Sequence, residues 1–224
     1  MGDNYLLTVL AALSEKPNFI PNLFTQKRYT AEGIFTIKVF VKGRPEDITV
    51  DDYFPVYSHQ PAFAKPTIDG GWWIPLIEKA FAKVHVNYEM ISSGTQAEAA
   101  RFLTGAPAEE FQNNIQTSEE VLQQLQNAVK EDYLVTAASF NEWNGLVNGH
   151  GYIVKNVYTF KKSDGSETHI VKMRNPFKII DGSQHWTGRY GADDHNSWSN
   201  ELKTHVEFDS LKPGEFFMTI DDFK

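Results

Sequence analysis

Residues 2–13, with the sequence GDNYLLTVLAAL, predict a helix near the start of the chain. Asp3 is a residue type that favours the N-cap position, so we expect the helix to begin at Asn4 and to run to about Glu15. Pro17 ends it, because proline cannot continue a helix. Asn4 is therefore expected at the helix N-terminus, where the helix dipole favours negative charge.

The next elements are expected to be a hairpin and a second helix. Alternating side chains predict a strand over residues 34–41, with a turn at residues 42–45 and a returning strand at residues 48–50. Residues 73–84 carry apolar side chains at helical spacing. Pro75 is compatible only with the first turn of that helix.

Two capping boxes mark further helices. Thr95 with Glu98 predicts a short helix, and Thr117 with Glu120 opens another. A polar stretch at residues 112–116 lies between them and predicts a boundary between two lobes. After the last helix, strands are expected at residues 134–139, 151–160, 168–174 and 216–220, with a hairpin turn at residues 163–166.

The order of these elements predicts the fold class. A mostly helical first half with one hairpin precedes a second half built from a helix and an antiparallel sheet. We therefore expect an α+β protein whose lobes are residues 1–112 and residues 113–224. The 224 residues suffice for one domain or two small ones.

Composition and charge exclude several classes of function. The formal net charge of −8 argues against nucleic acid and anionic membranes as partners, because both attract positive surfaces. No apolar run approaches the ~20 residues that a membrane span needs. The chain has no cysteine, which excludes disulfides, thiolate metal sites and thiol catalysis. These features fit a reducing, cytoplasmic compartment.

A histidine and an asparagine in the second half are candidates for chemistry. His150 opens a predicted strand in the segment NGHGY, and Asn175 follows another strand in the segment RNPF. Taken alone, His150 is most often a hydrogen-bonded structural residue, and Asn175 is a turn residue before proline. Their separation suits two neighbouring strands joined by the predicted hairpin.

Together these segments resemble the core of the calpain cysteine proteases. The family's Gly-Asp-Cys-Trp-Leu-Leu aligns with residues 2–7, so its nucleophilic cysteine falls on Asn4. Its Gly-His-Ala-Tyr places the general base on His150, and its Arg-Asn-Pro-Trp places the orienting asparagine on Asn175. Further matches follow in order: Gly33-Ile34-Phe35, Asp51-Asp52, residues 76–83, Tyr88-Glu89, Thr104-Gly105, residues 186–189, Ser197-Trp198 and residues 214–218. The resemblance implies a papain-like, two-lobed protease core.

Departures from the family pattern predict that the chain is not an active protease. A carboxamide nitrogen, as in Asn4, is not a useful nucleophile at neutral pH. Removing the nucleophile of a well-studied hydrolase costs on the order of 10⁶ in turnover. The glutamine of the family's oxyanion hole would fall before Met1. Tyr5 and Phe177 stand where the family has tryptophan.

The resemblance also implies a calcium site in each lobe, and here most of the required carboxylates are missing. The family's acidic positions correspond here to His185, Ala192, Pro213 and the retained Glu215 in the second lobe, and to Arg101 in the first. We therefore expect neither calcium nor another cofactor. Asp193 and Asp194 lie nearby in sequence and are expected to form a solvated acidic loop.

Two functions fit these observations. The first is a catalytically inactive calpain-like pseudoprotease that binds protein partners or serves as a structural component of an intracellular assembly. The family resemblance favours a cytoplasmic setting, with the cytoskeleton as the candidate assembly, and a cleft without catalysis can still hold an extended segment. The alternative is a calcium-dependent cysteine endopeptidase of the calpain type whose nucleophile is replaced by Asn4 in this chain.

Enzymes of other classes have less support. Ser92, Ser93 and Ser139 are alternative nucleophiles for His150, but none lies in a nucleophile-elbow motif. The seven histidines show no HExxH spacing, so a metal enzyme is not expected.

Overall fold

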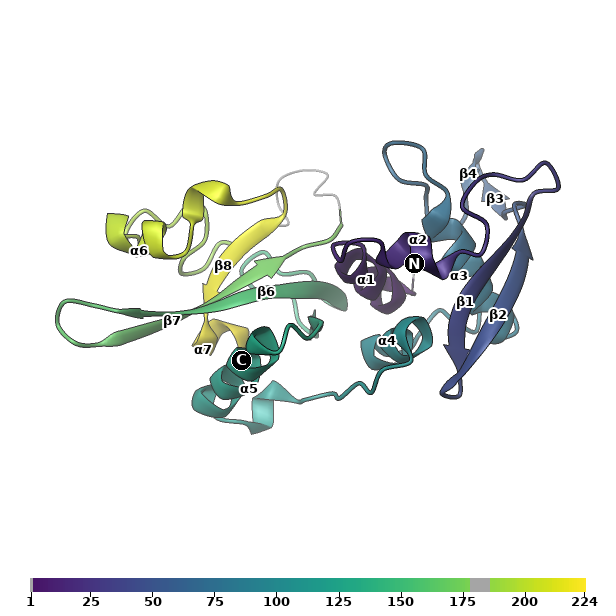
Figure 1. Ribbon diagram of the computed structural model, residues 1–224. Coiled ribbons are helices and arrows are strands. Elements are labelled where there is room, and N and C mark those ends of the chain that lie inside the picture. Colours follow the sequence, from purple (N-terminus) through teal and green to yellow (C-terminus); the bar gives the residue numbers. More distant parts are fainter. Residues whose placement is uncertain (1, 178–185) are drawn as a thin grey trace. The chain divides into compact units, whose positions relative to one another are not determined.

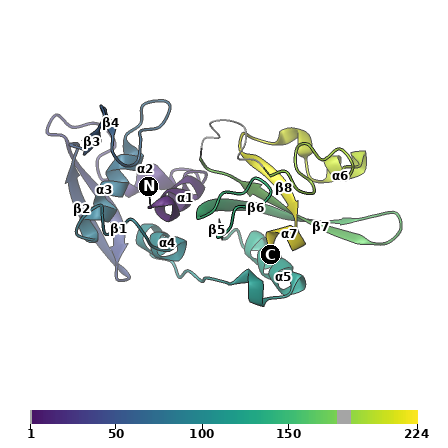
Figure 2. The same cartoon turned by 180° about the vertical axis from the view of Figure 1, so that it is seen from behind.

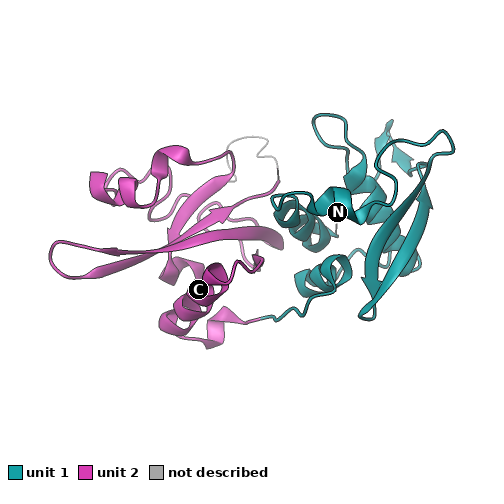
Figure 3. Cartoon of the chain, in the orientation of Figure 1, with its two compact units in different colours: residues 1–110 teal, residues 111–224 magenta. Residues whose placement is uncertain are grey.

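The computed structural model describes residues 2–177 and 186–224, which fold into two compact units, Met1–Glu110 and Phe111–Lys224 (Figure 3). Helices and antiparallel sheets occur together, which confirms the predicted α+β class. No helix in the described part of the chain is long and apolar enough to cross a membrane.

Unit 1 packs helices against a two-stranded antiparallel sheet (Figure 1). Helices α3 and α4 contact the hairpin β1–β2, and α1 contacts α4. The buried faces of these elements form the core of the unit, because apolar side chains recur on one side of each. The elements of unit 1 are α1 (Asn4–Leu13), α2 (Phe19–Leu23), β1 (Ile34–Val41), β2 (Arg44–Asp51), β3 (Val56–Tyr57), β4 (Gln60–Pro61), α3 (Trp73–Val84) and α4 (Gln96–Thr104).

The turn of the β1–β2 hairpin is tighter than predicted. Val41 pairs with Arg44, so only Lys42 and Gly43 form the loop. Both have positive φ, 50° and 76°, as a two-residue turn that matches the strand twist requires. The prediction that Arg44 and Pro45 lie in the turn was wrong, and both belong to β2.

Helix boundaries follow local side-chain hydrogen bonds. The first helix ends at Leu13 rather than Glu15, and the Ser14 hydroxyl donates to a carbonyl of its last turn. Thr95 accepts the backbone N–H of Glu98 as an N-cap should. The reciprocal half of that capping box is missing, because the Glu98 carboxylate lies 3.2 Å from His85 instead. The predicted box at Thr117 is complete.

Unit 2 is a four-stranded antiparallel sheet in the order β5-β6-β7-β8. Helices α5 and α7 lie on one face, and the segment with α6 lies on the other (Figures 1 and 2). The elements are η1 (Asn113–Ile115), α5 (Ser118–Lys130), β5 (Val135–Ser139), β6 (His150–Lys161), β7 (Glu167–Arg174), α6 (Asn200–His205), η2 (Phe208–Ser210), β8 (Glu215–Thr219) and α7 (Ile220–Phe223).

Alternation along the strands gives unit 2 two apolar clusters. On β7, Val171 packs in the cluster that includes α5, whereas its neighbour Ile170 packs with residues of α6. On β8, Met218 and Phe217 divide in the same way. Successive side chains of a strand point to opposite faces, so β7 and β8 supply both layers.

Candidate active site

Asn4, the predicted nucleophile position, is the first residue of α1 and is half-buried. The start of this helix is held against the segment around Ser92. A Cβ on Gly2 would lie 1.7 Å from the carbonyl oxygen of Ser92, so only glycine allows this approach. The Tyr5 hydroxyl donates to the carbonyl of Ile91 at 3.1 Å. The backbone before Asn4 is therefore fixed by close packing.

Asp3 does not cap α1, contrary to prediction. Its carboxyl is 4% exposed and lies against the carboxyl of Glu78, which is 1% exposed. The backbone N–H of Ala64 donates to both Glu78 oxygens at 3.0 Å. Burial, then the hydrogen bond and charge of Asp3, raises the pKa of Glu78 to about 9. At neutral pH Glu78 therefore holds a proton.

His150, the predicted general base, is the first residue of β6 and is 7% exposed. The preceding Gly149 has φ of 65°, a conformation that favours glycine, and its N–H donates to the Ser139 carbonyl at 2.8 Å. This turn brings His150 into register opposite Ser139 on β5. The position of the imidazole is thus set by the pairing of β6 with β5 at its first residue.

Asn175 follows β7 directly, and the structure brings it to His150. The distance from His150 Nε2 to Asn175 Oδ1 is 2.9 Å. The backbone N–H of Phe177 donates to the same Oδ1 at 3.0 Å, which fixes the orientation of the amide. Because Oδ1 can only accept, Nε2 carries the hydrogen, and Nδ1 of His150 keeps its lone pair.

The surroundings of His150 favour its neutral form. The rings of Tyr152 and Phe177 lie edge-on to the imidazole at centroid distances of 4.9 Å and 4.8 Å. Burial lowers the pKa of His150, and the hydrogen bond that the imidazole donates to Asn175 opposes this only in part. A neutral imidazole with a free Nδ1 can accept a proton from a nearby group.

No thiol is available to give His150 that proton, since the whole chain lacks cysteine. Ser139, one of the serines named above as alternative nucleophiles, pairs with His150 in the sheet. Its hydroxyl donates to the carbonyl of Val147. Ser139 is therefore engaged with its own hairpin rather than oriented towards the imidazole.

At two of the positions that correspond to the family's calcium sites, the side chains are engaged in contacts within the chain. Glu215 accepts from Lys172 Nζ at 3.0 Å and from the backbone N–H of Lys212 at 2.9 Å, so a cation already neutralises it. The Arg101 guanidinium donates to the carbonyl of Ala108. Within residues 2–177 and 186–224, no group of three or more acidic, histidine or cysteine side chains could hold a metal ion. His185 lies outside the described residues.

Asp194, expected in a solvated acidic loop, has a structural role. Its carboxylate accepts backbone N–H groups from Tyr190, Asn196 and Ser197 at 2.9–3.2 Å. Hydrogen bonds from the Ser197 side chain and these N–H groups lower the pKa of Asp194 to about 2. The carboxylate therefore organises the loop before α6.

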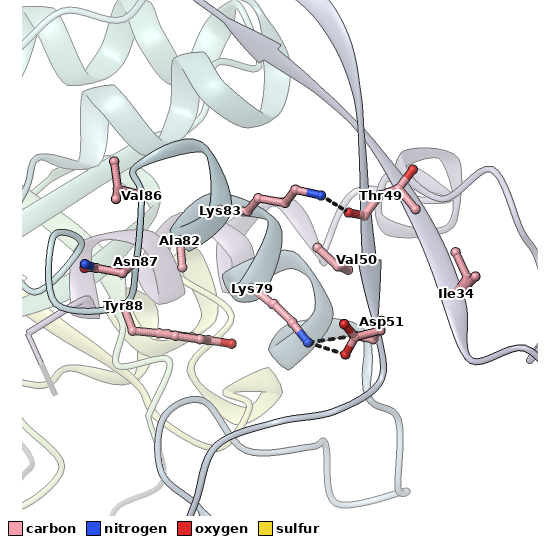
Figure 4. A pocket seen from close by; sticks show the side chains of 10 residues that line it. All are labelled: Ile34, Thr49, Val50, Asp51, Lys79, Ala82, Lys83, Val86, Asn87 and Tyr88. Atoms are coloured by element: carbon pink, nitrogen blue, oxygen red, sulfur yellow. Dashed lines mark hydrogen bonds and ion pairs between the residues drawn. The ribbon is translucent and has the colours of Figure 1, made fainter.

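A groove of about 620 Å³ lies on unit 1, and none of its lining residues is Asn4, His150 or Asn175 (Figure 4). Two lysines of α3 lie along it. Lys83 Nζ donates to the carbonyl of Thr49, and Lys79 Nζ contacts the carboxylate of Asp51 at 2.6 Å. Both ammonium groups are thus used to tie α3 to β2.

The contact between Asp3 and Glu78 was not predicted from the sequence. Glu78 lies in the predicted helix 73–84, next to the apolar side chains whose spacing predicts that helix. Pro75 and Ala82 are also buried, so the buried arc of α3 is wide enough to include Glu78. A carboxyl flanked by small and apolar residues on a helix is the signal that could have revealed it.

Comparison with known proteins identifies the family to which the chain belongs. A family model described as "Calpain family cysteine protease" matches residues 1–224. Calpain-type cysteine protease ADL1 of Oryza sativa subsp. japonica is 29% identical over 238 residues, covering 100% of this chain and 10% of that protein. Calpain-12 of Mus musculus is 30% identical over 237 residues, and calpain clp-4 of Caenorhabditis elegans 28% over 239, each covering 100% of this chain and 32% of the relative. The chain thus spans about a tenth to a third of these relatives.

Proposed function

This chain belongs to the calpain family of cysteine proteases, and because it lacks the family's thiol nucleophile we propose that it is a catalytically inactive member that binds other proteins. In this proposal Asn4 occupies the nucleophile position, with His150 as the former base and Asn175 as its orienting residue. The setting we propose is a cytoplasmic assembly, with the cytoskeleton as the candidate. Nucleic acid, membranes and calcium are not among the proposed partners.

The absence of cysteine from all 224 residues carries the catalytic part of this proposal. Acyl transfer by a papain-like site begins with attack by a thiolate, and the amide of Asn4 cannot replace it. The neutral His150 with its free Nδ1 would still accept a proton, but without an acidic group to donate one it starts no reaction.

The catalytic proposal is tested by restoring the thiol. Asn4→Cys is assayed with fluorogenic peptides in calcium or in chelator, next to the unaltered chain and to the double variant Asn4→Cys with His150→Ala. We expect no hydrolysis by the unaltered chain and no calcium-dependent turnover by Asn4→Cys, since the calcium positions do not supply the ligands. Robust turnover that depends on calcium and on His150 would contradict the proposal.

The binding proposal has a separate test. Gel filtration of a gentle cell extract, with antibody detection, gives the size of the native species. We expect it to elute well above the 25.5 kDa of this chain together with defined protein partners. Elution as a free monomer would contradict a structural role.

A second candidate is the calcium-dependent endopeptidase whose cysteine is replaced by Asn4 in this chain. The hydrogen bond between His150 and Asn175, at 2.9 Å, favours it, because that pair has the geometry of an intact base and orienting residue. The same Asn4→Cys assay separates the two candidates.

A further inference from the structure

A small aromatic pocket on unit 1 has the features of a side-chain binding site. It has a volume of about 170 Å³ and is lined by Tyr29, Phe35, Asp52, Phe54, Trp72 and Leu76. Phe35 and Leu76 are buried, whereas Tyr29 is 73% and Trp72 45% exposed. Such a volume suits one side chain rather than a whole peptide. None of these residues is a predicted catalytic or calcium position.

The aromatic walls are held in place by the fold. Trp72 is the N-cap residue of α3, and its carbonyl accepts the N–H of Leu76 at 3.1 Å. Its ring stacks on Phe54 at a centroid distance of 5.2 Å and an angle of 21°. Lys79 Nζ lies 5.5 Å from the centroid of Phe54, so this cluster already accepts a cation from its own chain.

Asp52 supplies the negative charge of the pocket. Its backbone N–H donates to the carbonyl of Gly33, whose φ is 62°. A Cβ on Gly33 would lie 2.5 Å from Asp52 Oδ1, so the glycine makes room for the carboxylate. The hydroxyl of Tyr29 donates to Oδ2 at 3.1 Å, which leaves other acceptor positions of the carboxylate open. Among the described residues, no cationic side chain pairs with Asp52.

We propose that this pocket binds an arginine side chain of a partner protein, with the guanidinium stacked on Trp72 or Tyr29 and paired with Asp52. Arginine combines a planar cation that stacks on aromatic rings with a fork of donors that matches a carboxylate. The chain's net charge of −8 favours a basic partner. An uncharged apolar side chain would fill the volume but leave the carboxylate without a partner. The inference is independent of the proposed loss of catalysis.

The test uses NMR of the isotopically labelled chain and three short blocked peptides with a single variable residue. Arginine is compared with citrulline, which has the same shape without the charge, and with norleucine, which is apolar. We expect the arginine peptide to bind in the millimolar range, to shift the indole N–H of Trp72, and to bind at least about fivefold more tightly than either neutral peptide.

Two variants check the location. Asp52→Asn keeps an acceptor for Tyr29 and should reduce arginine binding about fivefold, to the level of citrulline. Asp47→Asn, an exposed change on strand β2, which ends just before Asp52, should leave binding unchanged. Equal or tighter binding of norleucine would show an apolar pocket and overturn the proposal. The proposal is also overturned if no peptide, at a concentration of about 10 mM, shifts the indole N–H signal of Trp72. It is overturned as well if Asp52→Asn does not change arginine binding.

Discussion

Glu78→Gln is expected to stabilise the folded chain at neutral pH and to remove a pH dependence of its unfolding free energy. Folded Glu78 keeps its proton up to a pKa of about 9, whereas the ordinary value is 4.5. Between these values the folded state binds one proton more than the unfolded state, so stability falls as pH rises. The contribution of the protonated side chain is fully present below pH 4.5 and is lost as the pH approaches 9.

The size of the effect follows from the proton count. One extra bound proton gives a slope of about 1.4 kcal/mol per pH unit, or about 4 kcal/mol between pH 5 and pH 8. At pH 7 the variant should be more stable by up to about 3 kcal/mol, because glutamine has no proton to lose. Its amide N–H can also donate to Asp3 Oδ2, which has no partner among the described residues. The Ala64 N–H keeps an acceptor.

The assay is urea unfolding at pH 5, 6, 7 and 8, with hydrogen exchange on peptides from α1 and α3 to locate the change in unit 1. The measured quantity is the difference in unfolding free energy between variant and unaltered chain at each pH, so that other titrating groups cancel. Glu109→Gln, an exposed carboxyl, is the control and should give a difference near zero at every pH. A difference for Glu78→Gln that does not change with pH would refute the raised pKa of Glu78.

Three further predictions concern unit 2. Asn175→Ala should move the pKa of His150 still lower, because the hydrogen bond that favours the charged form is lost; a histidine NMR titration measures this, and an upward shift would contradict it. Thr117→Ala should lower the free energy of unfolding, measured in urea, by about 1 kcal/mol, since it removes the capping box of α5. An unchanged free energy would contradict a stabilising role for this cap. Lys172→Met should cost about 3 kcal/mol at pH 7, because it leaves the carboxylate of Glu215 buried without its cation, and lowering the pH should reduce the loss as that carboxylate protonates.

Elements with strong local patterns could be predicted from the sequence, and those fixed by distant contacts could not. The alternation over residues 34–41 gave β1 with its bounds, and the spacing over residues 73–84 gave α3. The short α2 and α6 were missed, because five or six residues carry too little periodicity to identify a helix. The turn after Val41 was predicted to be two residues longer than it is. Arg44 and Pro45 are residue types common in loops, and only the strand pairing shows that they belong to β2.

The same distinction holds at the candidate site. The spacing of the motifs predicted that His150 and Asn175 lie on neighbouring strands. In the structure, His150 Nε2 lies 2.9 Å from Asn175 Oδ1. The environment of Asp3 could not be predicted from the sequence. Its N-cap position predicts a local hydrogen bond, but its side chain interacts instead with Glu78, which is 75 positions away in sequence. Local propensity is a weak guide wherever a tertiary contact competes for the same group.

The pairing of His150 with Asn175 does not by itself indicate catalysis, because the fold needs it for another reason. A buried imidazole without a hydrogen-bond partner would be destabilising, and Asn175 Oδ1 supplies that partner. The same oxygen accepts the Phe177 N–H, and the Asn175 N–H donates to the carbonyl of Gly214 at 2.9 Å. These bonds connect the start of β6, the end of β7 and the approach to β8. A chain that lost its thiol would therefore keep this pair for stability, so the absence of cysteine is the more decisive observation about activity.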